Sequence, residues 1–184
     1  MAEPQLLFEN REKFAGKVKR SKGKVIVLVH PLYSLAWKDR KYRRALEGVM
    51  KKATAPIIVL EEAEKVAKTH AELKNAKPVY YVETVPNWVT PMQSWAALHT
   101  ALRNARVKTI LLGGMNAKHA EPDDAIFRLD RETAIRAYER SQRRPAYLPI
   151  TARCVGETYF RLIQGNHGKI RLMPELLSPD KPEY

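Results

Sequence analysis

The chain has 184 residues, of which 45% are hydrophobic and 29% are charged, a composition typical of one globular domain with an ordinary core. Its formal net charge of +13 is concentrated in residues 1–53, which makes polyanions candidate partners. No apolar stretch approaches the roughly 18 residues that a membrane helix needs, and a single cysteine, Cys154, excludes an internal disulfide. We therefore expect a cytoplasmic protein with no membrane partner.

Short β-branched runs alternate with stretches of helical periodicity along most of the chain. Residues 1–23 are predicted to form a basic N-terminal arm. The elements expected after this arm, in chain order, are a strand at 24–30, a helix at 37–52, a strand at 57–60, a helix at 62–75, a strand at 79–82, a helix at 92–105 and a strand at 107–113.

Residues 115–150 interrupt the alternation and are interpreted as a helical insertion. A helix is expected within it at 129–143, with Asp130 as the candidate N-cap. A last helix at 153–164 and a last strand at 169–173 follow. This order of elements predicts a single Rossmann-like α/β domain, in which helices cover both faces of a mainly parallel sheet of five or six strands to form a three-layer αβα sandwich.

Polar side chains and glycines follow several of the predicted strands. Because open α/β sheets bind ligands beyond the carboxyl ends of their strands, we expect a small-molecule ligand at this edge. The residues predicted to contact the ligand are Ser34, Glu61, Gly113, Gly114 and Thr158. The two adjacent glycines allow close approach of a ligand to the backbone, and a tight turn after the strand is the more common explanation of such a pair. No G-x-G-x-x-G motif follows the first strand and no Walker A sequence is present, so no cofactor is predicted.

Cys154 is the candidate nucleophile. It stands at the predicted N-terminus of the last helix, a position that suits a reactive thiol. The alternative is a small buried thiol that packs against the sheet. His30 follows the first strand and is a candidate base, since imidazole titrates near neutral pH. Glu83, which follows a later strand, is predicted to orient it.

The segment Cys154-Val155-Gly156-Glu157-Thr158 resembles the Cys-Val-x-x-Thr segment of isochorismatase-like cysteine hydrolases. The order of strands and helices is similar as well. The resemblance implies an α/β hydrolase, active or degenerate, in which the cysteine attacks an amide or related carbon of a small molecule. The chain departs from the family at two positions. His30 stands where the family has an aspartate, and the family's lysine after the third strand has no evident match.

Three other interpretations remain open. In the first, the chain is a nucleic-acid-associated protein without catalysis, and its basic side chains contact phosphates. The residues predicted to do so are Lys38, Arg40, Lys41, Arg43, Arg44, Arg136, Arg140, Arg143 and Arg144. In the second, mixed imidazole and carboxylate ligands bind a divalent metal ion, with His30, Glu61, Glu83 and His119 as candidates. In the third, the inserted helix forms a contact in a homo-oligomer.

Overall fold

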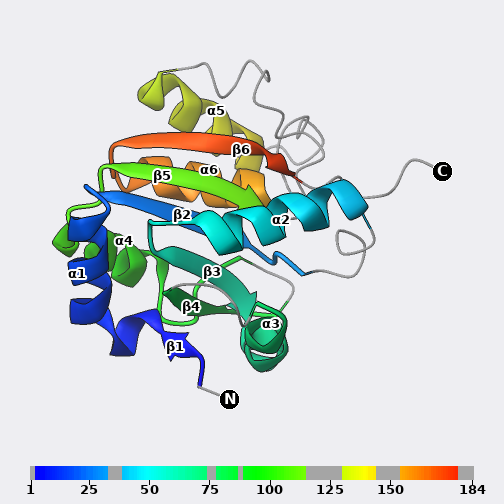
Figure 1. Cartoon of the computed structure of the whole chain (residues 1–184). Helices are drawn as coiled ribbons and strands as arrows, with labels where there is room; N and C mark the ends of the chain where they lie inside the picture. Colours follow the sequence, from blue (N-terminus) through cyan, green and yellow to red (C-terminus); the bar gives the residue numbers. More distant parts are fainter. Residues whose placement is uncertain are drawn as a thin grey trace.

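The computed structural model describes residues 3–32, 39–73, 78–86, 89–114, 130–143 and 154–177. Within these ranges the chain forms an all-parallel sheet of six strands with six α-helices, which confirms the predicted α/β three-layer sandwich (Figure 1). The strands are β1 (Gln5–Leu6), β2 (Lys24–Val29), β3 (Ile57–Glu62), β4 (Val79–Thr84), β5 (Thr109–Gly114) and β6 (Lys169–Leu177). The helices are α1 (Arg11–Arg20), α2 (Arg40–Lys52), α3 (Val66–Glu72), α4 (Trp95–Asn104), α5 (Arg131–Arg143) and α6 (Cys154–Gln164), with short 3-10 helices η1 (Leu7–Glu9) and η3 (Ala63–Lys65).

The strand order determines which strand ends lie side by side at the carboxyl edge of the sheet. The strands lie in the order β1-β4-β3-β2-β5-β6. The chain steps from β2 to β3 and β4 on one side, and it returns to place β5 and β6 on the other side. The gap between β2 and β5 is therefore the topological switch point, beyond which open α/β sheets bind ligands. His30 directly follows β2 and Gly114 ends β5, so these two residues flank that point.

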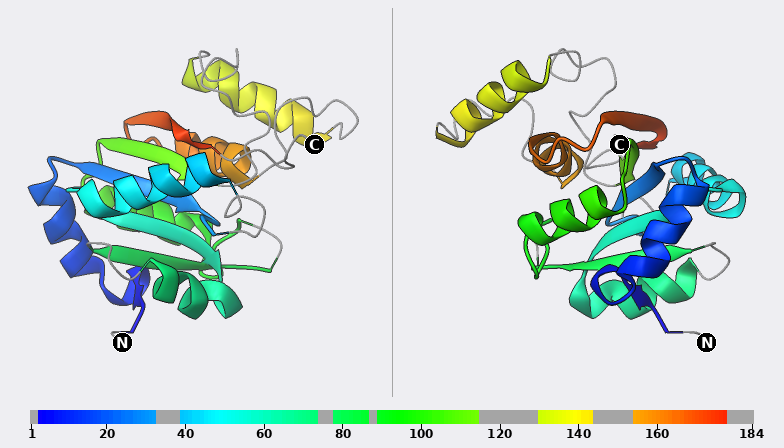
Figure 2. Two further views of the ribbon diagram at one scale, coloured as in Figure 1. Left: turned by 45° about the vertical axis from the view of Figure 1, so that its right-hand side comes forward. Right: turned by 90° about the vertical axis from the view of Figure 1, so that its left-hand side faces the viewer.

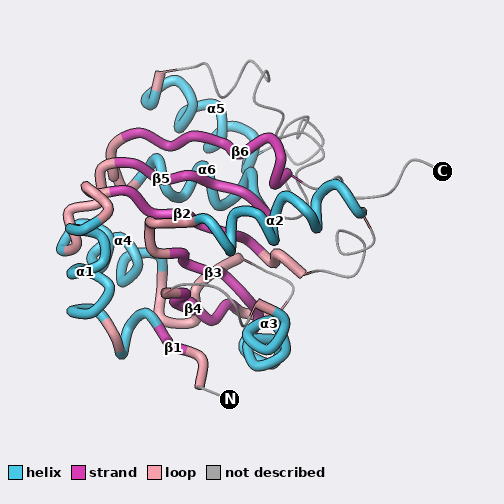
Figure 3. Tube along the Cα trace, in the orientation of Figure 1, coloured by secondary structure: helices cyan, strands magenta, loops and turns pink. Residues whose placement is uncertain are grey.

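Each face of the sheet carries its own apolar core, because successive side chains of a strand point to opposite faces. Ile26 and Leu28 of β2 pack in the core that α2 and α3 cover. Val25 and Val27 pack in the core that includes residues of α1, α4, α5 and α6. Figure 1 shows α2 and α3 in front of the sheet with α4 and α6 behind it, and the turned views in Figure 2 separate these layers. The tube in Figure 3 shows the strands side by side between the helices.

The N-terminal segment is folded against the sheet, although the sequence predicts an arm there. Strand β1 pairs with β4 in parallel. Leu7, Phe14 and Val18 are buried on the inner side of this segment. The ring of Phe14 meets the ring of Tyr80 on β4 edge-to-face, with 5.3 Å between the centroids. The basic side chains of α1 therefore occupy the outer surface of a helix that belongs to the core.

The other elements lie within a few residues of their predicted positions, and side-chain caps account for two helix starts. Asp39 accepts hydrogen bonds from the backbone amides of Lys41 and Tyr42 at the start of α2. Asp130 accepts one from the amide of Thr133 over 3.0 Å, which confirms its predicted role as the cap of α5.

Helix α5, the described part of the predicted insertion, packs on α6. The rings of Tyr138 and Phe160 stack with 4.6 Å between their centroids, and Arg131 donates hydrogen bonds to the carbonyls of Ile163 and Gln164 at the end of α6. The remaining residues of the predicted insertion lie outside the described ranges. None of the helices in the described part of the chain is long and apolar enough to cross a membrane.

Candidate active site

His30 occupies the first position after β2 in a backbone conformation that few non-glycine residues adopt. Its φ is +42°, and its amide donates a hydrogen bond to the carbonyl of Leu60 on the neighbouring strand over 3.0 Å. The side chain is buried, with the residue 6% exposed. Left-handed backbone of this kind costs free energy and is concentrated at functional sites.

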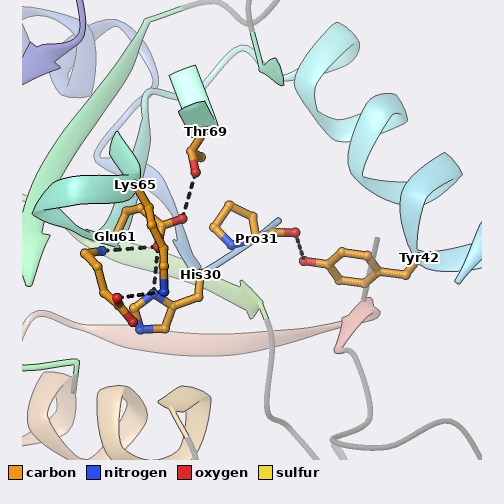
Figure 4. A network of polar contacts seen from close by, with 7 residues as sticks. His30, Pro31, Tyr42, Glu61, Lys65 and Thr69 are labelled. Atoms are coloured by element: carbon orange, nitrogen blue, oxygen red, sulfur yellow. Dashed lines mark hydrogen bonds and ion pairs between the residues drawn. The ribbon is translucent and has the colours of Figure 1, made fainter. Parts of the chain in front are cut away.

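Glu61 is the carboxylate that binds His30. The Nδ1 atom of His30 lies 3.0 Å from Oε1 of Glu61, and both side chains are buried (Figure 4). Oε2 of Glu61 accepts a hydrogen bond from the hydroxyl of Thr69 on α3 over 2.9 Å. Oε1 also accepts one from the backbone amide of Glu62 over 3.1 Å. Three donors thus hold the carboxylate in one orientation, which in turn determines the orientation of the imidazole.

The thiol of Cys154 is the second hydrogen-bonding partner of the His30 side chain. Cys154 is the first residue of α6 and is half-buried, and it makes a side-chain hydrogen bond with His30. Because Nδ1 faces Glu61, Nε2 is the ring nitrogen left for the thiol. The arrangement is therefore thiol, imidazole and carboxylate in sequence, from the start of α6, the end of β2 and the end of β3.

The partners of His30 control its charge. Burial alone lowers the pKa of an imidazole, but the hydrogen bonds with Cys154 and Glu61 and the negative charge of these partners raise the pKa of His30 to about 9. The imidazole therefore holds a second proton at neutral pH, and each of its nitrogens can donate to an acidic partner.

Further polar groups surround this series. Lys65 of η3 forms an ion pair with the buried carboxylate of Glu62 over 2.7 Å (Figure 4). The hydroxyl of Tyr42 on α2 donates a hydrogen bond to the carbonyl of Pro31 over 3.1 Å. Burial, followed by the nearby charge of Glu61, raises the pKa of the Tyr42 phenol. Tyr42 therefore stays a neutral donor that anchors the residue after His30.

Glu83, the predicted orienting carboxylate, is placed one strand too far from His30. It stands opposite Glu61 in the β3–β4 register and is half-buried. Within the described ranges it makes no hydrogen bond to His30, whose Nδ1 binds Glu61 instead. The structure therefore gives the orienting position to Glu61, which the sequence predicts as a ligand contact.

Packing explains the two glycines at the end of β5. A Cβ on Gly113 would lie 2.7 Å from Cβ of Leu176, and one on Gly114 would lie 2.2 Å from the carbonyl oxygen of Val29. The φ of Gly114 is +137°, which a side chain would strain further. Close contact with the neighbouring strands thus accounts for both residues. Their predicted contact with a ligand stays a prediction.

The other predicted ligand contacts are placed as follows. Thr158 lies one turn after Cys154 on α6 and is completely buried, and within the described part of the structure its hydroxyl has no hydrogen-bond partner. Such an unpaired buried hydroxyl costs free energy and calls for an explanation. Ser34 lies outside the described residues.

The predicted nucleic-acid contacts fall on two helices. On α2, Arg40, Lys41 and Arg44 are exposed, and Arg43 lies 3.9 Å from Glu47 in an ion pair. On α5, Arg136 forms an ion pair with Glu132. The remaining predicted contacts are outside the described residues or have side chains that are, namely Lys38, Arg140, Arg143 and Arg144. Binding of nucleic acid along these helices stays a prediction, as does an oligomer contact through α5.

No group of three or more His, Cys, Asp or Glu side chains in the described ranges is arranged to hold a metal ion. His119, one of the candidate ligands, lies outside these ranges.

Comparison of the chain with protein-family models, with curated proteins and with solved structures found no match. The resemblance to isochorismatase-like hydrolases therefore stays a prediction, supported by the Cys-Val-x-x-Thr segment and the order of elements.

Sequence reasoning missed the roles of Thr69 and Lys65. Thr69 appears in the sequence as one polar residue of an amphipathic helix, and its contact with Glu61 depends on how α3 packs on the sheet. Lys65 appears as one of several surface lysines, and the short helix η3 brings it to Glu62. Neither residue belongs to a motif, so only the tertiary structure identifies them.

Proposed function

We propose that this chain is a cysteine-dependent enzyme of the acyl-transfer class, a cytoplasmic hydrolase that acts on a small molecule carrying an amide or ester. The observation that carries the proposal is the hydrogen-bonded series of Cys154, His30 and Glu61 at the carboxyl edge of the sheet. A nucleophile bound to a base, which is in turn oriented by a third group, recurs in nucleophilic enzymes of unrelated fold. The strand order supports it, because the series lies at the switch point.

In the proposed first step, His30 holds the proton of the thiol on Nε2, and Sγ of Cys154 attacks the carbonyl carbon. The carbon–sulfur bond forms as the carbonyl π electrons move to the oxygen. Backbone amides in the first turn of α6 have no acceptor within the helix, so they are available to this oxyanion. His30 then gives its proton to the leaving nitrogen or oxygen as that bond breaks, and a thioester remains on Cys154.

In the second step, water attacks the thioester carbon and gives a proton to His30. The carbon–sulfur bond then breaks, the carboxylic acid leaves, and the proton on His30 returns to the thiolate. Glu61 keeps Nε2 directed at Cys154 through both steps and stabilises the imidazolium. The pKa of about 9 for His30 supports a resting state in which the imidazole already carries the proton that the leaving group receives.

The proposal is tested by trapping the acyl enzyme. We expect p-nitrophenyl acetate to acetylate Cys154 of the native protein, with a burst of p-nitrophenol followed by slower turnover as the thioester hydrolyses. Mass spectrometry of the intact protein and of the peptide that contains Cys154 locates the acetyl group. The assignment is unambiguous because the chain has no second thiol.

Two variants separate catalysis from ordinary thiol chemistry. In Cys154→Ala the burst disappears, and any acetylation that remains belongs to surface lysines. In His30→Asn the thiol is present without its base, and we expect the burst rate to fall by roughly 10²-fold or more. An unmodified Cys154 in the native protein, or a burst that is equally fast in His30→Asn, would refute the proposed function.

A further inference from the structure

A basic groove lies at the amino edge of the sheet, away from Cys154. It has a volume of about 550 Å³ and is formed by α1, the turn between α1 and β2, and the turn between α4 and β5. Four of its lining residues are cationic, namely Lys19, Lys22, Arg106 and Lys108. The remaining lining residues are small or neutral, namely Ala15, Gly16, Gly23, Asn104 and Ala105. No carboxylate of the described residues contributes to the lining.

The fold brings these cations together because the turn between α1 and β2 contacts the turn between α4 and β5. Lys22 and Arg106 have φ values of +56° and +55°, so each turn reverses through a left-handed residue. The carbonyl of Gly23 accepts a hydrogen bond from the amide of Lys108 over 2.8 Å. A Cβ on Gly23 would lie 2.9 Å from Cγ of Lys108 and 3.2 Å from the carbonyl oxygen of Arg106. Glycine at position 23 thus lets two basic turns meet.

The positive charge in this groove is not neutralised by the described part of the chain. All four cationic residues are exposed, and none of them forms an ion pair with a described carboxylate. Four clustered cations around one groove, without a described carboxylate to neutralise them, produce a focused positive potential that attracts anions.

Helix α1 forms one wall of the groove, and this wall has no side chain at Gly16. Gly16 lies in the middle of α1, and a Cβ added there would meet no atom of the described residues within 4 Å. Packing within the protein therefore does not require glycine, although glycine inside a helix is less favourable than alanine. A missing side chain at the wall leaves room for a ligand to approach the helix backbone.

We infer that this groove binds an anion with several clustered phosphoryl groups. Lysine binds phosphate as a point charge, and the arginine guanidinium can bind two phosphate oxygens at once. The volume is within the range of small-molecule sites, which favours an anion of triphosphate or nucleotide size. The phosphoryl groups can belong to a free small molecule or to the end of an oligonucleotide, and both sources present the same chemistry.

This site is independent of the proposed enzyme chemistry. The groove precedes β2 and β5, whereas His30 follows β2, so the two sites are separated by about 20 Å, the length of a six-residue strand. Binding at the groove and acylation of Cys154 are therefore expected to fail or succeed separately.

The test measures binding of inorganic tripolyphosphate to the full chain by calorimetry at low ionic strength. We expect binding at one site that weakens as salt is added. The triple variant Lys19→Gln, Lys22→Gln and Lys108→Gln should bind roughly tenfold more weakly or not at all. Its matched control carries Lys51→Gln, Lys52→Gln and Lys68→Gln, three exposed lysines outside the groove, and loses the same charge from +13. This control should retain the native affinity.

Circular dichroism shows whether each variant is folded before its affinity is compared. Competition by adenosine triphosphate and by a 5′-phosphorylated oligonucleotide then distinguishes the two sources: the better competitor at equal phosphate concentration identifies the ligand type. Absence of tripolyphosphate binding to the native protein at low salt would overturn the inference. Equal weakening in both triple variants would overturn it as well, because it would show attraction by net charge alone.

Discussion

His30 and Glu61 are 31 positions apart in the sequence, yet Nδ1 and Oε1 of their side chains lie 3.0 Å apart. The contact exists because β2 and β3 are adjacent parallel strands that pair Val29 with Leu60, so the residues that follow them emerge together at the carboxyl edge. Hydrogen bonds from Thr69 and from the amide of Glu62 hold the carboxylate in place. The charge state of His30 therefore depends on groups of three separate elements, namely β3, α3 and, through Cys154, α6.

Replacing Glu61 by Gln should lower the pKa of His30 and slow the modification of Cys154. The native pKa of about 9 depends in part on the hydrogen bond and charge of Glu61, so we expect a fall of at least about one unit in E61Q. The pH titration of the His30 ring proton by NMR measures this change. Alkylation of Cys154 by iodoacetamide at pH 7 should slow by roughly tenfold in the same variant.

Glu83→Gln is the matched control for this experiment. Glu83 lies opposite Glu61 in the sheet but makes no hydrogen bond to His30 within the described ranges. The pKa of His30 and the alkylation rate should therefore stay close to their native values. A larger effect from Glu83 than from Glu61 would restore the residue that the sequence predicts and contradict the observed orientation.

The difference between these two glutamates shows how far the sequence predicts the site. The apolar runs before His30 and Glu61 predict strands, and parallel strands predict that both residues meet at one edge. The sequence does not tell which strands are neighbours, because every βαβ connection is compatible with several strand orders. Glu83 and Glu61 are therefore equivalent candidates until the order β4-β3-β2 places β3 beside His30.

The N-terminal segment shows a second limit, which arises from local composition. Basic residues surround the two apolar side chains Phe14 and Val18, so the segment has the composition of a solvated arm. Their spacing of four residues places both on one face of a helix, but two residues are too few to predict burial. Packing against β4, including the contact with Tyr80, decides the structure.

Replacing Phe14 by Ala tests this packing directly. Phe14 is 1% exposed, so we expect the free energy of unfolding to fall by about 3–5 kcal/mol. Urea denaturation followed by circular dichroism measures the change. Lys13→Ala, at the exposed neighbouring position, should change the stability by less than about 0.5 kcal/mol. Equal stability of both variants would show that residues 11–20 do not contribute to the core.

The raised pKa of His30 predicts that the protein loses stability in mild alkali. The native state holds the proton of His30 up to about pH 9, whereas the unfolded chain releases it near 6.5. The proton on His30 therefore adds about 3 kcal/mol to the free energy of unfolding below pH 6.5. This contribution is lost as the pH rises from 6.5 to 9. Urea denaturation from pH 6 to pH 9.5 measures the loss.

The matched variant for the alkaline measurement is His30→Asn, which has no imidazole to titrate. The stability difference between the native protein and this variant should shrink as the pH rises through this window. A difference that stays constant from pH 6 to pH 9.5 would show that His30 does not hold a proton between Cys154 and Glu61.

A pair of stacked histidines, His99 and His167, should make the protein less stable in acid. Nδ1 of His99 on α4 lies 2.7 Å from Nε2 of His167, and the two rings stack. Burial, the neighbouring His99 and Arg103 lower the pKa of His167 to about 4. The native state therefore excludes a proton that the unfolded chain takes up below about pH 6.5. Stability from this source is present above pH 6.5 and declines as the pH falls to 4.

Gly165→Ala is expected to weaken this acid sensitivity, because it separates the two rings. A Cβ at position 165 would lie 2.2 Å from Nε2 of His167 and 2.2 Å from Nδ1 of His99, so one ring must move. We expect the pKa of His167 in this variant, measured by NMR, to rise toward 6.5, and the stability at pH 7 to fall. Because Gly16 has no atom of the described residues within 4 Å of an added Cβ, Gly16→Ala serves as the control and should leave the histidine titration unchanged. A native pKa for His167 in G165A would show that the contact between the rings does not set its charge.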